Sequence, residues 1–253
     1  MHTRGDGAYM MQAILIFTLG SFVLGGICLY GSGRAVDAET QRRRWIKYLT
    51  YLVIVHVVIG IAIAGPFYFT AFMTAVAIVG AHELIRVTLS NGRPPARSRH
   101  TIWIFCLYSL LAYAVVRFSQ QSTSGEILFV YLVTAAFDGT SQLTGQSIGR
   151  LPLAPRISPN KTVEGALGGL AAAILTAFAL RSLADLSTLQ APFVGLLLAI
   201  AALTGDLAAS FVKRLHGVKD FGTLLPEHGG VMDRFDSLLV AAPSFLVFVL
   251  WSR

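Results

Sequence analysis

The feature that most constrains this chain is its succession of long apolar blocks. A helix that crosses the hydrocarbon core of a bilayer needs about 20 mostly apolar residues, and eight blocks approach that length. They cover residues 9–31, 47–64, 66–85, 101–118, 126–140, 163–181, 191–211 and 237–252. Only 13% of the residues are charged, compared with about 25% in soluble domains. We therefore predict an all-α fold, a polytopic membrane bundle of about eight transmembrane helices.

Basic residues give this predicted bundle a direction across the membrane. Lys and Arg occur in every second connection between blocks, whereas the stretches at 64–67, 119–125 and 182–190 contain none. Cytoplasmic loops of membrane proteins carry an excess of Lys and Arg. We expect the four basic connections to face the cytoplasm, at the inner membrane if the source is bacterial. The net charge of +7 then reflects topology and attraction to membrane lipids rather than nucleic-acid binding.

Chemistry-bearing residues concentrate in the second half of the chain. We predict N-terminal transmembrane helices in 1–125 and a catalytic region with cytoplasmic loops in 126–253. The first block is interpreted as a retained span, since no cleavage site of small residues follows it. Cys28 and Cys106 lie in different blocks without metal-type spacing, so we interpret them as packing residues.

The connection at 205–237 mixes acidic residues with serine and basic residues. If the seventh helix continues through "TGDLAASFVKRLHG", then Asp206, Ser210 and Lys213 share one face, because their spacing is i, i+4 and i+7. This arrangement would bring an acid, a hydroxyl and an ammonium group to the same side of the helix end.

A second acidic group opens the eighth block. Asp233, Asp236 and Ser237 are spaced i, i+3 and i+4, so they share a face of that helix. Acids at a membrane edge are costly, and neighbouring carboxylates repel one another unless a cation lies between them. Because hard oxygen ligands favour Mg²⁺, we predict that Asp206, Asp233 and Asp236 bind magnesium.

Basic residues and glycines in the same region suit a phosphate ligand. The basic side chains are those of Lys213, Arg214, Lys219 and Arg234, and the glycines are Gly222, Gly229 and Gly230. Glycine lets the backbone approach a ligand closely. In the other polar connection, Thr162 follows "SPNK" and is predicted to cap a helix whose N-terminus attracts anions. Acids, bases and glycines together are what phosphoryl-type transfer requires.

Several polar residues have simpler interpretations, which stay open. Asp138 and Glu164 have an interfacial cap as their alternative role. His228 is interpreted as a hydrogen-bonding loop residue rather than a metal ligand. Glu83, in "GAHELIRV", is interpreted as an acid that reaches the interface or pairs with Arg86 at i+3, in preference to a site residue.

The longest pattern runs from Ser210 to Asp236. It reads Ser-x-x-Lys-Arg, then Lys-Asp-x-Gly, then Pro-x-His-Gly-Gly-x-x-Asp-Arg-x-Asp. This pattern resembles the signature of the phosphatidate cytidylyltransferases, also called CDP-diacylglycerol synthases. The upstream "PRISPNKTVEG" is similar to a second block of that family, and "HELIRV" resembles a short family element. The resemblance covers roughly residues 137–237.

The resemblance implies a reaction and a set of roles. Phosphatidate would attack the α-phosphorus of CTP, giving CDP-diacylglycerol and pyrophosphate, with Mg²⁺ required and a second cation left open. Asp206 and Asp233 would be the chief metal ligands, with Asp236 in support. The implied catalytic residues are Asp206, Asp233, Lys219, Arg234 and Lys161. The implied substrate-binding residues are Ser210, Lys213, Arg214, Asp220, His228, Gly229, Gly230, Asp138, Ser158 and Asn160.

Two departures from the family pattern leave the lipid acceptor open. Glu227 stands where the family usually has glycine, and "FDGTSQLTG" lacks the aromatic residue that commonly follows the acid and glycine. The alternatives are a CTP-dependent enzyme acting on another lipid phosphate or a polyprenol, an anion transporter, and a scaffold that has lost activity. Charge at one membrane face and the lack of an inverted repeat disfavour the transporter. A homodimer packed through the glycine-rich first blocks is a further expectation.

Overall fold

The structure is a computed structural model that describes residues 37–90, 98–224 and 229–252, together with Ile14, Ile16 and residues 18–20, 22–23, 25–27 and 29–31. Most of these residues are helical, which confirms the predicted all-α class. The chain forms two compact units, residues 1–57 and 58–253. The predicted functional boundary at residue 125 is a separate division, which stays a prediction.

In the first unit, aromatic rings surround Phe22. Its ring lies 5.6 Å from the Tyr48 ring and 5.6 Å from the His56 ring, measured between centroids. The Tyr48 hydroxyl also donates a hydrogen bond to the Phe22 carbonyl. Tyr48 and His56 belong to helix α2 (Ala38–Ala64), which starts in this unit and ends in the second.

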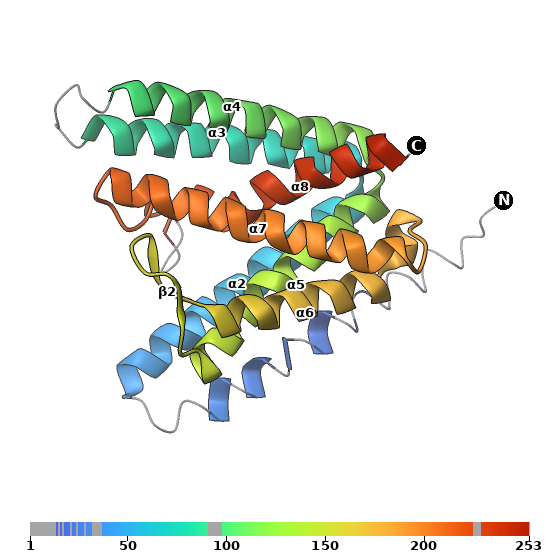
Figure 1. Ribbon diagram of the computed structural model, residues 1–253, viewed down its shortest axis with the longest axis horizontal. Helices are drawn as coiled ribbons and strands as arrows, with labels where there is room; N and C mark the ends of the chain where they lie inside the picture. The colour runs from blue at the N-terminus through green and yellow to red at the C-terminus, as the bar shows by residue number, and fades with distance from the viewer. Residues whose placement is uncertain are drawn as a thin grey trace. The chain divides into compact units, whose positions relative to one another are not determined.

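The second unit contains the remaining helices. In chain order they are α3 (Pro66–Ser90), α4 (Ser98–Gln121), α5 (Ser124–Ile148), α6 (Val163–Ala179), the 3₁₀ helix η3 (Arg181–Ala184), α7 (Gln190–Leu215) and α8 (Met232–Ser252). Helices that follow one another pack side by side, α3 with α4, α5 with α6 and α7 with α8 (Figure 1). α8 also contacts α3, α4 and α5.

Among the described residues, six helices are long and apolar enough to cross a membrane: α2, α3, α4, α5, α7 and α8. Their outward side chains include large apolar groups, such as Phe67, Trp103 and Trp251, which are 78%, 73% and 83% exposed. Exposed apolar surface of this kind is stable in lipid and costly in water. The protein is therefore an integral membrane protein. Of the other two predicted spans, 163–181 corresponds to the shorter helix α6, and 9–31 lies partly outside the described residues.

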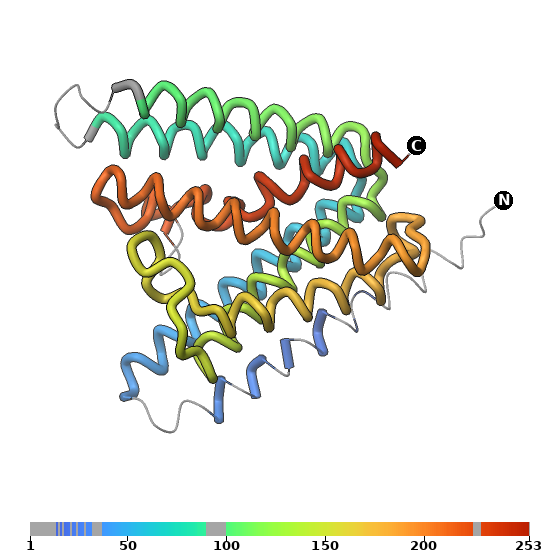
Figure 2. The backbone as a smooth tube through the Cα atoms, in the orientation of Figure 1, coloured from blue at the N-terminus to red at the C-terminus, as the bar shows by residue number. Residues whose placement is uncertain are grey.

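An antiparallel hairpin, which the sequence did not predict, occupies the connection between α5 and α6. Its strands are β1 (Pro152–Ala154) and β2 (Ser158–Thr162). Figure 2 shows the hairpin beside the end of α7, and β2 contacts α5, α6 and α7. Prolines in this segment favour an irregular loop, but a short two-stranded hairpin consists of edge strands, where proline is tolerated.

Glycines allow the helices of the second unit to approach closely. A Cβ atom on Gly169 of α6 would overlap the Ser141 hydroxyl of α5, and one on Gly205 of α7 would overlap the Asp236 carbonyl of α8. Small residues at such crossings are typical of packed membrane helices. The contact at Gly205 sets the distance between the two helices that carry Asp206, Asp233 and Asp236.

Candidate active site

Polar side chains from two distant connections meet at one end of the second unit. The elements involved are the C-terminal ends of α5 and α7, the N-terminal ends of α6 and α8, and the hairpin between α5 and α6. Three side-chain contacts join them: Lys161 with Asp206, Lys213 with Asp233, and Ser237 with Asp138. These contacts connect the two polar regions that the sequence singled out.

Asp206 on α7 pairs with Lys161 from the hairpin. Lys161 is the penultimate residue of β2, directly before Thr162, whose hydroxyl accepts the Gly165 N–H at 3.1 Å and caps α6 as predicted. The cap fixes where β2 ends, and so where the lysine projects. Ser210 donates to Asp206 Oδ1 at 3.4 Å, which confirms that these two residues share a face of α7.

Both carboxylate oxygens of Asp233, in the first turn of α8, accept hydrogen bonds. Lys213 Nζ donates to its Oδ1 at 2.7 Å, and their side chains are 11% and 2% exposed. The other oxygen, Oδ2, accepts the backbone N–H of Phe221 at 2.8 Å and that of Gly230 at 2.9 Å. The Lys213 ammonium also lies 5.4 Å from the centre of the Phe221 ring, a cation–π distance. Asp233 therefore binds two separate parts of the α7–α8 loop, one at Phe221 and one at Gly230.

Gly229 needs to be glycine for two reasons. Its φ angle is +79°, a region that residues with a Cβ atom rarely adopt. A Cβ there would also lie 2.9 Å from Asp233 Oδ2 and 2.9 Å from Asp220 Cβ. The glycine thus brings the loop backbone against the acid.

Three carboxylates form an acidic cluster: Asp138 on α5, Asp206 on α7 and Asp236 on α8. Asp138 and Asp236 each interact electrostatically with Asp206 and with one another. Ser237 connects two of them, since its hydroxyl donates to Asp138 Oδ1 at 3.2 Å and its N–H donates to Asp236 Oδ1 at 2.9 Å. Lys161, Lys213 and Arg234 offset part of this negative charge.

The donor set fits a magnesium ion that takes few protein ligands. Within the described residues, no three His, Cys, Asp or Glu side chains converge as a direct metal-binding group. Mg²⁺ is usually held by one or two carboxylates, together with water and substrate phosphate oxygens. Asp206 and Asp236 provide hard oxygens of this kind, and a cation between them would reduce the repulsion between the neighbouring carboxylates.

Glu83 of α3 belongs to this end of the unit, although an interfacial role is preferred for it from the sequence. It is 2% exposed, and it accepts the Val231 N–H through Oε1 and the Met232 N–H through Oε2, each at 2.9 Å. The interpretation of Glu83 as an acid that reaches the interface is therefore wrong. Nor is it paired with Arg86 among the described ion pairs.

Other predicted site residues lie around the rim. Arg214 donates to the Ile157 carbonyl at 3.2 Å and to the Val218 carbonyl at 3.3 Å, so it attaches the hairpin turn to the end of α7. Ser158 pairs with Ala154 across the hairpin. Arg214 is exposed, as are four other members of the predicted set: Asn160, Lys219, Asp220 and Arg234. His228, like Glu227, lies outside the described residues.

Glu164 acts as a backbone cap, the simpler of its two roles. Its carboxylate accepts the N–H of Arg150 at 3.0 Å and that of Leu151 at 3.2 Å. It thereby holds the start of the hairpin against the first turn of α6.

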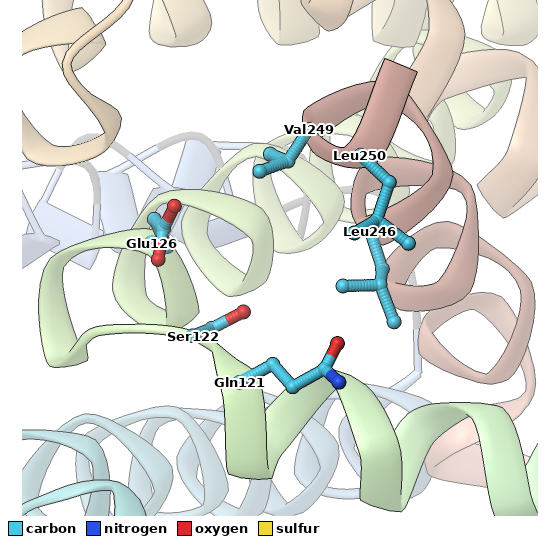
Figure 3. Close-up of a pocket in the computed structure, with 6 residues that line it drawn as sticks. All are labelled: Gln121, Ser122, Glu126, Leu246, Val249 and Leu250. Carbon is cyan, nitrogen blue, oxygen red and sulfur yellow. The ribbon is translucent and has the colours of Figure 1, made fainter. Parts of the chain in front are cut away.

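A pocket at the other ends of α5 and α8 is separate from these groups. It is lined by Gln121, Ser122, Glu126, Leu246, Val249 and Leu250 (Figure 3). Glu126 precedes Asp138 by twelve residues on α5, which corresponds to about 18 Å along the helix axis. Its carboxylate is engaged in a capping box with Thr123. The pocket therefore adds nothing to the acidic cluster.

Comparison with known proteins identifies similar sequences. Residues 96–252 match the model of the cytidylyltransferase family. The chain is 37% identical over 166 residues to the uncharacterized protein YnbB of Escherichia coli (strain K12), covering 61% of this chain and 56% of that protein. It is 42% identical over 142 residues to the phosphatidate cytidylyltransferase of Brucella abortus biovar 1 (strain 9-941), covering 56% and 53%. It is also 42% identical over 129 residues to that of Bacillus subtilis (strain 168), covering 49% and 46%.

The matched region coincides with the site. The chain spans about half the length of these curated relatives, and the aligned family segment, residues 96–252, includes α5, the hairpin, α7 and α8. Asp138, Lys161, Asp206 and Asp233 all lie within it. The chain belongs to the cytidylyltransferase family.

Proposed function

We propose that this protein transfers a cytidylyl group from CTP to phosphatidate, giving CDP-diacylglycerol and pyrophosphate. A phosphate oxygen of the lipid would form a bond to the α-phosphorus of CTP, while the bond from that phosphorus to the bridging oxygen of pyrophosphate breaks. Family membership supports the cytidylyl part of the proposal. Relatives named phosphatidate cytidylyltransferase support the lipid acceptor.

The observation that carries the proposal is the pair of lysine–aspartate contacts. Lys161 reaches Asp206, and Lys213 reaches Asp233, so each ammonium group is held beside a carboxylate at this end of the unit. A positioned ammonium stabilises the charge that moves onto phosphate oxygens during transfer. We assign Lys161 and Lys213 to the phosphates of the bound substrates, with the exposed Lys219 and Arg234 at the rim where phosphates enter.

Magnesium is the proposed cofactor, held by Asp206 and Asp236, with Asp233 as a further ligand. When bound, it would neutralise and orient the phosphate oxygens of CTP. Asp233 would serve as a ligand by exchanging the Lys213 ammonium at Oδ1, while its Oδ2 keeps the loop amides. That exchange would also free Lys213 to bind phosphate. Ser210 would keep Asp206 oriented through its hydroxyl. A second cation stays an open prediction.

The decisive experiment uses the full chain, purified in detergent, with labelled CTP, phosphatidate and Mg²⁺. Release of pyrophosphate and formation of a labelled lipid are followed together. We expect turnover by the parent protein and loss of it on chelation of Mg²⁺. Asp233→Asn should lower turnover by about 100-fold or more, because it weakens the electrostatic centre. Asp185→Asn is the matched control, since Asp185 is exposed and has a left-handed conformation that asparagine tolerates.

Other results would redirect the proposal. Turnover of CTP with a different lipid phosphate, but not with phosphatidate, would keep the chemistry and change the acceptor. Absence of CTP chemistry with every lipid tested, together with ion-driven uptake of an anion into liposomes, would replace the enzyme with a transporter.

We also propose that the reaction takes place at the cytoplasmic face, because basic residues are concentrated at the site end of the second unit. Lys161, Lys213, Arg214, Lys219 and Arg234 lie there, whereas residues 182–190 at the other end contain neither Lys nor Arg. The expected homodimer stays a prediction, since part of the first glycine-rich block lies outside the described residues.

A further inference from the structure

We propose that Glu83 is a positioning residue for the site: it anchors the α7–α8 loop and the first turn of α8 to helix α3, and thereby holds Asp233 in place. The anchoring follows from contacts between described residues. Only its effect on turnover rests on the proposed function.

The first support is a run of three consecutive backbone amides, each with a carboxylate acceptor. The Gly230 N–H donates to Asp233 at 2.9 Å. The next two, those of Val231 and Met232, donate to the two oxygens of Glu83, each at 2.9 Å. Asp233 therefore fixes the loop from within its own segment, and Glu83 fixes it from a helix about 150 residues earlier in the chain.

The second support is the close approach of backbone to the Glu83 carboxylate. A Cβ atom on Gly222 or on Gly230 would lie 2.5 Å from Glu83 Oε1, a distance that would force the acid or the loop to move. Glycine at both positions leaves room for the carboxylate between two parts of the same loop. Gly222 and Gly230 therefore accommodate this acid, a role different from the ligand contact predicted for them.

The third support is the setting of the carboxylate. Glu83 is 2% exposed and Met232 is 8% exposed, so water does not replace the contact if it is lost. A buried N–H without an acceptor is unfavourable. The N–H groups at the start of α8 also form the positive end of the helix dipole, which favours an acid there. Loss of this acceptor would release the segment that carries Asp233, and the ion pair between Asp233 and Lys213 would then lose its fixed geometry.

A positioning role for Glu83 and a general packing role predict different effects of its substitution on activity and stability. Outer-shell partners of a catalytic group typically change activity by about 10- to 100-fold when removed. A residue that orients Asp233 should lower kcat while leaving the binding of CTP nearly unchanged. A residue that only stabilises the bundle should loosen many helices together.

The test compares the parent with Glu83→Gln and Glu83→Asp. Glutamine keeps the shape but offers one oxygen and places an NH₂ group against the second backbone N–H. Aspartate keeps both oxygens on a stem one methylene shorter. Glu126→Gln is the matched control, because Glu126 also accepts a backbone N–H before a helix, that of Thr123 at 2.7 Å, at the opposite end of α5.

Two readouts are measured on full-length protein in detergent. Hydrogen–deuterium exchange reports the amides of peptides that include residues 229–233. Steady-state kinetics with CTP and phosphatidate separates kcat from KM. For Glu83→Gln we expect exchange in these peptides to rise by about tenfold or more and kcat to fall by about 10- to 100-fold. KM for CTP should change by less than about threefold. Glu83→Asp should have a kcat between those of Glu83→Gln and the parent. Glu126→Gln should match the parent in both exchange and kcat.

The outcomes separate this inference from the proposed function. Glu83→Gln with parental exchange and parental kcat would overturn the inference. So would a rise in exchange spread equally over α5, α6 and α7, since that indicates general destabilisation. If the parent shows no CTP turnover, but Glu83→Gln raises exchange in the 229–233 peptides alone, the anchoring is supported and the proposed function fails.

Discussion

Lys213 shows how one residue at the end of α7 joins two helices through an ion pair within the candidate site. Its ammonium group is held between the Asp233 carboxylate and the Phe221 ring, and its side chain is 11% exposed. A buried charge without its partner is strongly unfavourable, whereas removal of both partners together can be nearly neutral. Stability and activity should therefore respond differently to single and double substitutions.

A double-mutant cycle tests this pair. We expect Lys213→Met to destabilise the protein by about 3–5 kcal/mol, because it leaves Asp233 buried without its cation. Asp233→Asn should also destabilise, and the double variant should lose less stability than the sum of the two. Unfolding of the purified protein measures each change. The control is the exposed pair Glu39 and Arg43, whose side chains are 72% and 60% exposed and whose coupling should not exceed about 0.5 kcal/mol. Additive losses at Lys213 and Asp233 would contradict the prediction.

At the level of elements, the approach of α7 to α8 determines the geometry of the acidic cluster. Gly205 lies next to Asp206 in sequence and faces the backbone carbonyl of Asp236 on the other helix. α7 and α8 can therefore approach this closely only because position 205 of α7 has no side chain. Any group added there must push α8, and the acids in its first turns, away from α7.

Substitution of this glycine should uncouple the two helices. We expect Gly205→Ala to cost about 1–3 kcal/mol of stability through overpacking, and to lower turnover because Asp233 and Asp236 move with α8. Thermal unfolding and the cytidylyl transfer assay measure the two effects. Gly60→Ala in α2 is the control, since a Cβ there has open space and alanine favours a helix. Parental activity and stability of Gly205→Ala would show that α8 adjusts freely.

The elements also show what the sequence could and could not predict. Apolar runs predicted the helices well, because a membrane span depends on local composition. Spacing along α7 predicted that Asp206 and Ser210 share a face, since that relation lies within one turn. The hairpin was not predicted, because its strands are short and proline-rich. The Glu83 contact joins residues far apart in the chain, so no local pattern could reveal its partners.

On the scale of the whole molecule, the alternation of basic and non-basic connections predicts which ends of the helices face the cytoplasm. Within the second unit, the exposed residue Thr223 lies in the α7–α8 loop, and the exposed residue Thr188 lies just before α7 begins. These two positions are therefore at opposite ends of α7. Lys213, Arg214 and Lys219 accompany Thr223, whereas Arg181 is the single basic residue in the connection that holds Thr188.

Cysteine labelling tests this orientation. In a background with Cys28 and Cys106 replaced by serine, we expect Thr188→Cys to react with a membrane-impermeant maleimide in intact cells. Thr223→Cys should react only after the cells are opened, because its loop faces the cytoplasm. Each variant is first checked for parental turnover. The reverse labelling pattern would show that the site faces outward.

The anchoring of the α7–α8 loop by Glu83 has a consequence for how proteins of this kind can be recombined. The segment that matches the family begins at residue 96, after the end of α3, yet two amides inside that segment donate to Glu83 on α3. A hybrid that grafts residues 96–252 onto unrelated leading helices would inherit two donors without their acceptor. A hybrid made from two relatives should therefore fold only when α3 is transferred together with the segment, or when the recipient has an acidic residue of its own at the position of Glu83.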